Sequence, residues 1–114
     1  MAEFTIEQIR TIPHDLIGAY LHLNTINSEI ISAYVGRSTT SLRRRQQEWY
    51  QIGTQFNELI LFSSENEKDA YHKECELFHS LSKDILENKI HPGSIHNHVC
   101  PWCNFSINTK EELI

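Results

Sequence analysis

The segment IGAYLHLNTINSEIISAYVG, residues 17–36, decides the fold of this chain. Apolar residues take every second position from Ile17 to Leu23 and again from Ile31 to Val35. A period of two is typical of a β-strand that buries one face. The polar sequence NTINSE separates the two stretches and favours a turn. The segment therefore predicts a hairpin of two antiparallel strands.

The register of this hairpin is predicted from its apolar faces. Paired residues on antiparallel strands point to the same face of the sheet. The apolar residues of both stretches have odd numbers, so odd-numbered residues must pair with odd-numbered residues, and the two numbers of each pair have an even sum. A sum of about 54 centres the turn within NTINSE. This register places Tyr20 directly opposite Tyr34.

Size and charge restrict what the protein can be. The chain has 114 residues, which suits one domain: 1–114, with a core of about 14–90 and a Cys/His tail at 91–105. Its formal net charge of −5 at pH 7 argues against a protein that coats nucleic acid, because such binding needs many phosphate contacts. This charge does not exclude a local cluster of basic residues that binds nucleic acid. No signal peptide or membrane-spanning run is visible, so we expect a cytoplasmic protein without a membrane partner.

A third strand and further helices are expected around the hairpin. Residues 5–12 predict a short helix or turn, and residues 56–62 predict the third strand. Ser64 and Glu67 form a capping box for a long helix that ends near residue 86. We therefore predict an α/β (α+β) domain: a small three-stranded, mostly antiparallel sheet flanked by helices, with a Cys/His-containing tail.

A run of three arginines lies in the helix predicted over residues 42–53, directly after the hairpin. Four of its residues fall on one face at helical spacing: Leu42, Arg45, Trp49 and Ile52. Arg45 is thus expected at the inward edge of the helix. Arg43 and Arg44 point elsewhere and favour a solvated face.

The long helix after the third strand carries a carboxylate on its inward side. Its inward stripe comprises Ala70, Glu74, Leu77, Phe78, Leu81 and Ile85. A carboxylate facing the core is costly unless it is paired, hydrogen-bonded or bound to a cation. Glu74 is therefore a candidate functional residue, whereas the neighbouring Cys75 is expected to be a packing residue.

Taken together, four features resemble the GIY-YIG nuclease superfamily. They are GAY at 18–20, YVG at 34–36, an arginine-bearing helix directly afterwards, and Glu74 four residues after Ala70. The resemblance spans residues 17–88. It implies a metal-dependent endonuclease that hydrolyses phosphodiester bonds in DNA. Because so small a domain has little surface for reading sequence, we expect specificity to come from the shape of the substrate, such as branched or structured DNA, from a homodimer or from a partner protein.

The resemblance also implies roles for single residues. Tyr20 would orient the attacking water or take its proton, and Tyr34 would align it. Glu74 would hold Mg²⁺ or Mn²⁺, since Mg²⁺ keeps most of its waters and needs only one or two carboxylates. Asn88 matches the asparagine that closes the site.

The catalytic arginine has two candidates. Counting from Gly36 selects Arg44, whereas counting from Leu42 selects Arg45. The helical stripe favours Arg45, whose planar guanidinium would clamp the scissile phosphate. Arg37 and Arg44 are then expected to bind substrate beside it.

A second constellation lies in the tail: His91, His96, His98, Cys100 and Cys103. Two sulfurs and two imidazoles can form a tetrahedral Zn²⁺ site, and we select His91, His98, Cys100 and Cys103. The CxxC pattern alone is half of a zinc signature, and two buried or free thiols are the alternative.

Each feature also has a structural explanation, which leaves rival functions open. The tyrosines could be packing residues, and Glu74 could form a purely structural ion pair with Arg45. Trp49 stands where many family members carry His or Tyr, with Tyr50 and His22 as candidates to replace that group. The rivals are a catalytically inactive GIY-YIG-like module that binds nucleic acid or a protein, and a zinc-stabilised interaction domain.

Overall fold

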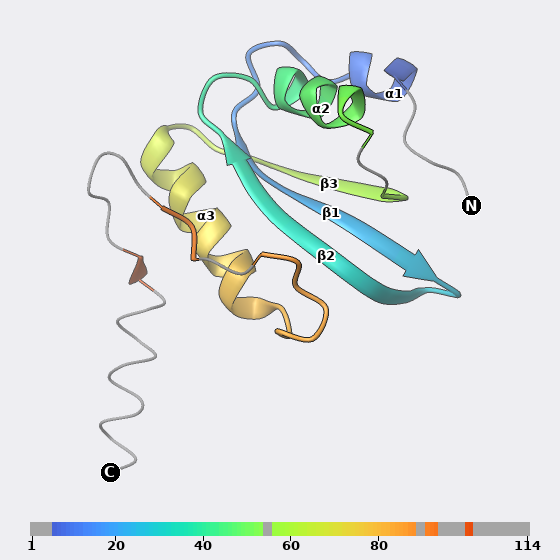
Figure 1. Cartoon of the computed structure of the whole chain (residues 1–114). Coiled ribbons are helices and arrows are strands. Elements are labelled where there is room, and N and C mark those ends of the chain that lie inside the picture. Colours follow the sequence, from blue (N-terminus) through green and yellow to red (C-terminus); the bar gives the residue numbers. More distant parts are fainter. Residues whose placement is uncertain (1–5, 54–55, 89–90, 94–99, 102–114) are drawn as a thin grey trace.

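The computed structural model describes residues 6–53, 56–88, 91–93 and 100–101. Within them the elements follow in this order: α1 (Ile6–Arg10), β1 (Gly18–Ile26), β2 (Glu29–Ser38), α2 (Leu42–Gln51), β3 (Glu58–Ser63) and α3 (Glu67–Ser80). The strands form one antiparallel sheet in the order β2-β1-β3 (Figure 1). The predicted α+β fold with a three-stranded sheet and flanking helices is confirmed.

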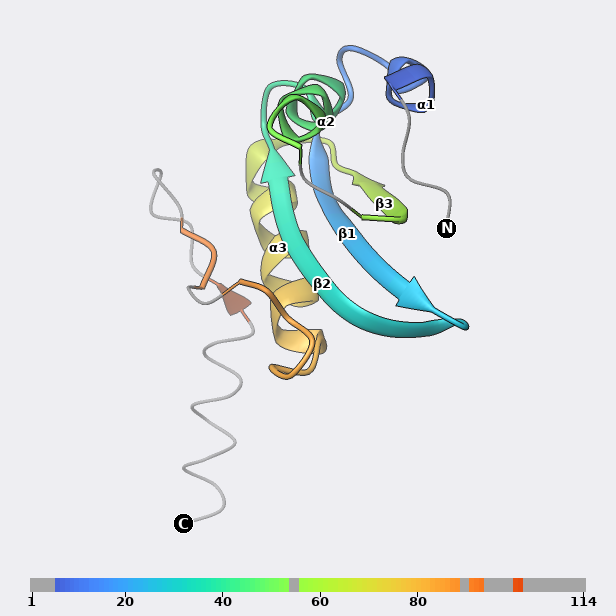
Figure 2. The ribbon, with the colours of Figure 1, turned by 45° about the vertical axis from the view of Figure 1, so that its right-hand side comes forward.

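The sheet separates two clusters of buried side chains, with α1 and α2 on one face and α3 on the other (Figures 1 and 2). The cluster beneath α3 has an aliphatic centre formed by Leu21, Leu23, Ala33, Val35 and Leu86. The cluster beneath α1 and α2 is centred on Ile9, Ile12, Tyr20 and Leu42. Successive residues of β1 therefore pack alternately in the cluster beneath α3 and in the cluster beneath α1 and α2.

The predicted register of the hairpin is wrong by two residues. Tyr20 pairs with Gly36, and Tyr34 pairs with His22. The turn consists of Asn27 and Ser28, which both have positive φ. A two-residue turn at this place pairs Ile26 with Glu29, so the numbers of paired residues next to it have an odd sum. An irregularity between Asn24 and Thr25 shifts the pairing by one residue. This bulge restores the even sum that keeps the apolar residues on one face.

Helix α2 has the ends that the sequence predicted. The side chain of Ser41 accepts a hydrogen bond from the backbone N–H of Arg44, and Gly53 follows the helix with a φ of 82°. The inward face is formed by Leu42, the buried Gln46 and part of Trp49. The prediction for Ile52 is wrong: its side chain is 73% exposed, because it lies at the C-cap where the chain leaves the helical path.

Helix α3 begins later and ends earlier than predicted. Its N-cap is Asn66, whose side chain accepts from the backbone N–H of Asp69. The predicted capping box is absent, because the helix begins at Glu67 and the backbone N–H of Ser64, with which Glu67 would pair, donates to the carbonyl of Ile17. After Ser80 the chain turns back, and Leu86 forms a parallel bridge with Ala33 at the outer edge of β2. Within the part of the chain that is described, none of the helices has the length and apolar character needed to cross a bilayer.

Candidate active site

A cavity of about 300 Å³ opens at the end of β2. Seven residues line it: Tyr20, Tyr34, Gly36, Arg37, Thr39, Arg45 and Glu74. Four of the five predicted catalytic residues are among them, and they come from β1, β2, α2 and α3: Tyr20, Tyr34, Arg45 and Glu74. Arg37, which was predicted to bind substrate, also lines the cavity. Because β2 is an edge strand, groups from both faces of the sheet can reach the cavity.

The two motif glycines make room for this arrangement. A Cβ at Gly36 would lie 2.4 Å from both Cζ and Oη of Tyr20, so the tyrosine ring lies directly over the glycine. Gly18 has a φ of +149°, and a Cβ there would lie 1.9 Å from the carbonyl oxygen of Phe62. Glycine is needed at both positions because any larger residue would separate β1 from its neighbours or displace the ring.

The hydroxyl of Tyr20 is buried and accepts a hydrogen bond from Trp49. Its side chain is 1% exposed, and the indole Nε1–H of Trp49 donates to its hydroxyl at 2.7 Å. Burial is the main reason why the pKa of Tyr20 rises to about 12. Because indole can only donate, the phenol oxygen accepts, and the phenolic hydrogen can be donated to a ligand.

Tyr34 lies beside Tyr20 and is only partly buried. The two ring centroids are 6.4 Å apart, and the ring of Trp49 meets Tyr34 edge-on at 5.1 Å. Burial raises the pKa of Tyr34, the negative charge of Glu74 raises it further, and Arg45 opposes both. Tyr34 is therefore neutral at pH 7 and is the phenol of this pair with more access to solvent.

Arg45, rather than Arg44, lines the cavity that contains the tyrosines. The side chain of Arg45 is 50% exposed and its Nη1 lies 3.2 Å from Oε1 of Glu48. Arg44 is 78% exposed, and its Nε lies 4.0 Å from Oε2 of the same glutamate. Exposed ion pairs of this kind are weak, so both guanidinium groups can turn toward a phosphate.

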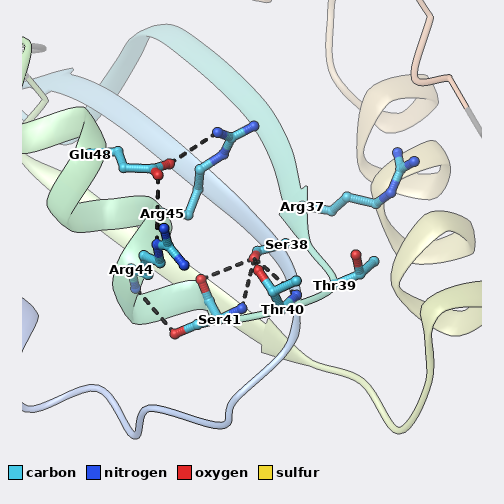
Figure 3. A pocket seen from close by; sticks show the side chains of 8 residues that line it. All are labelled: Arg37, Ser38, Thr39, Thr40, Ser41, Arg44, Arg45 and Glu48. Carbon is cyan, nitrogen blue, oxygen red and sulfur yellow. Dashed lines mark hydrogen bonds and ion pairs between the residues drawn. The ribbon is translucent and has the colours of Figure 1, made fainter.

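A second cavity, of about 290 Å³, adjoins the N-terminus of α2. Its lining, drawn in Figure 3, is Arg37, Ser38, Thr39, Thr40, Ser41, Arg44, Arg45 and Glu48. In this view Arg44 and Arg45 reach toward Glu48, whereas Arg37 points away toward α3. The two cavities share Arg37, Thr39 and Arg45, so they form adjoining parts of one polar surface.

Glu74 is 7% exposed and forms an ion pair through Oε1 with Nη1 of Arg37. The expected alternative, a pair with Arg45, is thus replaced by a pair with Arg37. Arg37 is also held by the Gly93 carbonyl and by the ring of Tyr71, whose centroid is 5.1 Å from its Cζ. Burial raises the pKa of Glu74, and Arg37 opposes that rise.

The cavity suits a small, hard cation better than a large or soft one. Glu74 offers one carboxylate, of which Oε1 is engaged by Arg37, so Oε2 is the oxygen on which a cation could bind. Mg²⁺ and Mn²⁺ accept such sparse oxygen coordination because Mg²⁺ retains most of its waters. The cavity thus offers a cation one free carboxylate oxygen, beside the guanidinium of Arg37.

Asn88 lies outside this cavity and closes the edge of β2 instead. Its Oδ1 accepts from the backbone N–H of Val35 at 2.8 Å, and its Nδ2 donates to the carbonyl of the same residue at 2.8 Å. The side-chain amide thus replaces a neighbouring strand for one residue. Asn88 supports the strand that carries Tyr34 but does not line the cavity.

His22 and Tyr50, which were proposed to replace the His or Tyr that many GIY-YIG nucleases carry at the position of Trp49, do not line the cavity. His22 is buried against Phe56, with ring centroids 3.8 Å apart, and its Nε2 lies 2.6 Å from Oε1 of Gln46. Burial lowers the pKa of His22 to about 4, so the imidazole is neutral and structural. Tyr50 is exposed on α2.

A second group of side chains that can bind a metal includes Cys75 of α3, the residue after Glu74. The ligand atoms of Cys75, His91 and Cys100 all lie within 4.8 Å of one another, so this group could hold a metal ion. His91 and Cys100 were predicted as ligands, whereas His98 and Cys103 lie outside the described residues. Cys75 was expected only to pack. The odd number of cysteines was the one signal in the sequence that could have drawn attention to it.

Comparison of this chain with protein-family models, with curated proteins and with solved structures found no match. The resemblance to GIY-YIG nucleases consequently remains a prediction from residues and their order. The geometry of the cavity is the basis for a functional proposal.

Proposed function

We propose that this chain is a metal-dependent endonuclease that hydrolyses phosphodiester bonds in DNA. The observation that supports this best is that two phenols, one guanidinium and one carboxylate from four separate elements line a single cavity. Hydrolysis of a phosphodiester needs donors and positive charge for the phosphate oxygens, and an activated water. Residues that served only for packing would not need to share a cavity open to solvent.

In this proposal the DNA backbone binds along the surface formed by the two cavities. Arg45 contacts the scissile phosphate, and Arg44 contacts a neighbouring phosphate beside the hydroxyls of residues 38–41. Arginine, serine, threonine and helix N-termini are the usual phosphate contacts in DNA complexes. Such contacts carry no sequence information, so we expect DNA shape, including branched structures, to select the substrate.

Glu74 is the proposed ligand for Mg²⁺ or Mn²⁺. When bound, the ion supplies positive charge to the phosphate oxygens and lowers the pKa of a bound water. Burial raises the pKa of Glu74, and the positive charge of Arg37 opposes that rise and so favours the ionised form.

The two phenols act through hydrogen bonds in this mechanism. Tyr20 donates its hydrogen to a phosphate oxygen, since Trp49 already occupies its acceptor side. Tyr34 accepts a hydrogen bond from the attacking water and orients it. This assigns Tyr20 to charge stabilisation and moves the water-orienting role to Tyr34.

A catalytically inactive module that binds nucleic acid or a protein is the second candidate. This candidate is favoured because Tyr20 and Glu74 already have partners within the chain: Trp49 donates a hydrogen bond to Tyr20, and Arg37 forms an ion pair with Glu74. In this case the basic surface would bind a partner, and no bond would be cleaved.

Cleavage assays separate the two candidates. The purified full chain is incubated with plasmid and branched DNA in Mg²⁺ or Mn²⁺, beside Glu74→Gln and Arg45→Ala. We expect metal-dependent cleavage by the wild type and a loss of about 100-fold or more in each variant, because each removes a group that stabilises the transition state.

Two matched controls remove the same charges from the same helices. Glu76→Gln breaks only the pair with Lys73, and Arg43→Gln breaks only the contact with His14. Both should cleave as the wild type does. DNA binding by a wild type that cleaves no substrate would replace the first proposal with the second, and equal cleavage by all variants would point to a contaminating nuclease.

A further inference from the structure

Three side chains that are far apart in the sequence meet beside α3. Cys75 belongs to α3, His91 precedes Pro92 and Gly93, and Cys100 precedes Pro101. Their ligand atoms lie within 4.8 Å of one another. Tetrahedral zinc with Zn–S near 2.3 Å and Zn–N near 2.0 Å holds its ligand atoms about 3.5 to 3.8 Å apart. Small side-chain movements therefore suffice to close the three ligands on one ion.

The chemistry and burial of this group favour zinc over a hard cation. Cys75 is 0% exposed and Cys100 is 6% exposed, and both pack with Tyr71. Thiolate and imidazole are soft donors that select Zn²⁺ over Mg²⁺. Neither of these two cysteines forms a disulfide. Two sulfurs and an imidazole gathered in so small a core are better explained by a shared ion than by packing alone.

The orientation of His91 is also that of a metal ligand. Its Nδ1 lies 2.8 Å from the carbonyl oxygen of Pro92, so Nδ1 donates its hydrogen there and Nε2 carries the lone pair. A backbone carbonyl that fixes the tautomer in this way is common behind metal-bound histidines. The Nε2 atom of His79 lies 3.2 Å from this Nε2.

The same segment contacts the proposed active site. The Gly93 carbonyl accepts a hydrogen bond from Arg37, and the Pro92 carbonyl lies 3.4 Å from the hydroxyl of Tyr71. Cys75 directly follows Glu74 in α3. An ion bound to His91 and Cys75 would thus fix the distance between α3 and the segment that holds Arg37.

We infer that Cys75, His91 and Cys100 bind a structural zinc ion that fastens residues 91–93 and 100–101 to α3. Zinc binding at this site does not depend on the nuclease activity proposed above, because its ligands do not line the cavity that holds Tyr20 and Tyr34. Its effect on that cavity runs through Gly93 and Arg37.

The test uses the full chain, purified and freed of any affinity tag. Elemental analysis should find about one zinc per chain in the wild type, and replacement by cobalt should give the absorption of a tetrahedral cobalt thiolate. Cys75→Ser, Cys100→Ser and His91→Gln should each lose most of the bound metal. His72→Gln, on the same helix but outside the group, should keep it.

Alkylation of the cysteines in the wild-type protein tests the site without variants, some of which could fold poorly. Peptide mapping should show Cys75 and Cys100 protected while zinc is bound and alkylated once a zinc-selective chelator is added. The inference is overturned by a wild type that takes up no zinc on dialysis against it, by a Cys75–Cys100 disulfide, or by unchanged alkylation after chelation. A zinc-bound protein that cleaves no DNA would contradict the proposed function and leave this site in place.

Discussion

The two faces of strand β1 differ in how they use buried side chains. Toward α3, Leu21 and Leu23 pack in an aliphatic cluster whose stabilisation depends on buried area and has no preferred direction. Toward α2, Tyr20 bonds to Trp49 and His22 bonds to Gln46, so each ring has a fixed orientation. The face of β1 toward α3 therefore stabilises the sheet, and the face toward α2 orients the groups that approach the cavity.

The largest expected effect on stability is on the aliphatic face. Leu23→Ala should lower the free energy of unfolding by about 3 kcal/mol, because it leaves a cavity in the cluster beneath α3. Denaturant unfolding measures this change. Ile31→Ala, at a position 48% exposed on β2, should cost less than about 0.5 kcal/mol. If the proposed function holds, the folded fraction of Leu23→Ala retains its cleavage rate, and a matching loss of rate would show that the two faces are not separable.

A smaller effect is expected where the two strands meet beneath Tyr20. Gly36→Ala places a methyl group 2.4 Å from the phenol, so the ring must move. We expect a loss of about 2 kcal/mol in unfolding free energy from overpacking, and at least a tenfold loss of cleavage. Ile31→Ala, at an exposed position of the same strand, is the control. Equal behaviour of the two variants would contradict the role of the glycine.

Removal of a single hydroxyl tests orientation without changing packing. Tyr20→Phe leaves the indole N–H of Trp49 without its acceptor, so unfolding free energy should fall by about 1 kcal/mol. Cleavage should fall about tenfold or more if Tyr20 donates to the phosphate. Tyr50→Phe, on the exposed side of α2, should match the wild type in both measurements. Loss of stability with full cleavage would restrict Tyr20 to a structural role.

The smallest effect concerns pH. Burial lowers the pKa of His22 from its ordinary value of 6.5 to about 4, so the unfolded chain binds more protons between these values. The contribution of neutral His22 is fully present above about pH 6.5 and is lost as the pH falls toward 4. Between pH 7 and 6 the loss should be about 0.5 to 1 kcal/mol. Denaturant titrations of the wild type and His22→Gln should show a steeper pH dependence in the wild type; parallel curves would rule out this assignment.

Features that depend on local periodicity could be predicted from the sequence. A period of two placed Leu21, Leu23, Ala33 and Val35 on one face of the hairpin, and a period of 3.6 placed Glu74 on the inward side of α3. Glycines and cap residues marked the ends of α2. These properties follow from the geometry of a few consecutive residues, which any local sequence pattern reflects.

Contacts between residues that are far apart in the sequence could not be predicted and follow from the folded structure. The bulge near Asn24 moved Tyr20 away from Tyr34 and over Gly36, because the turn and the apolar faces required different registers. Arg37 became the partner of Glu74, and Cys75 joined His91 and Cys100. Such pairings depend on how strands and helices pack across the whole chain. Periodicity gives the face on which a side chain lies, and it does not specify which residue lies opposite.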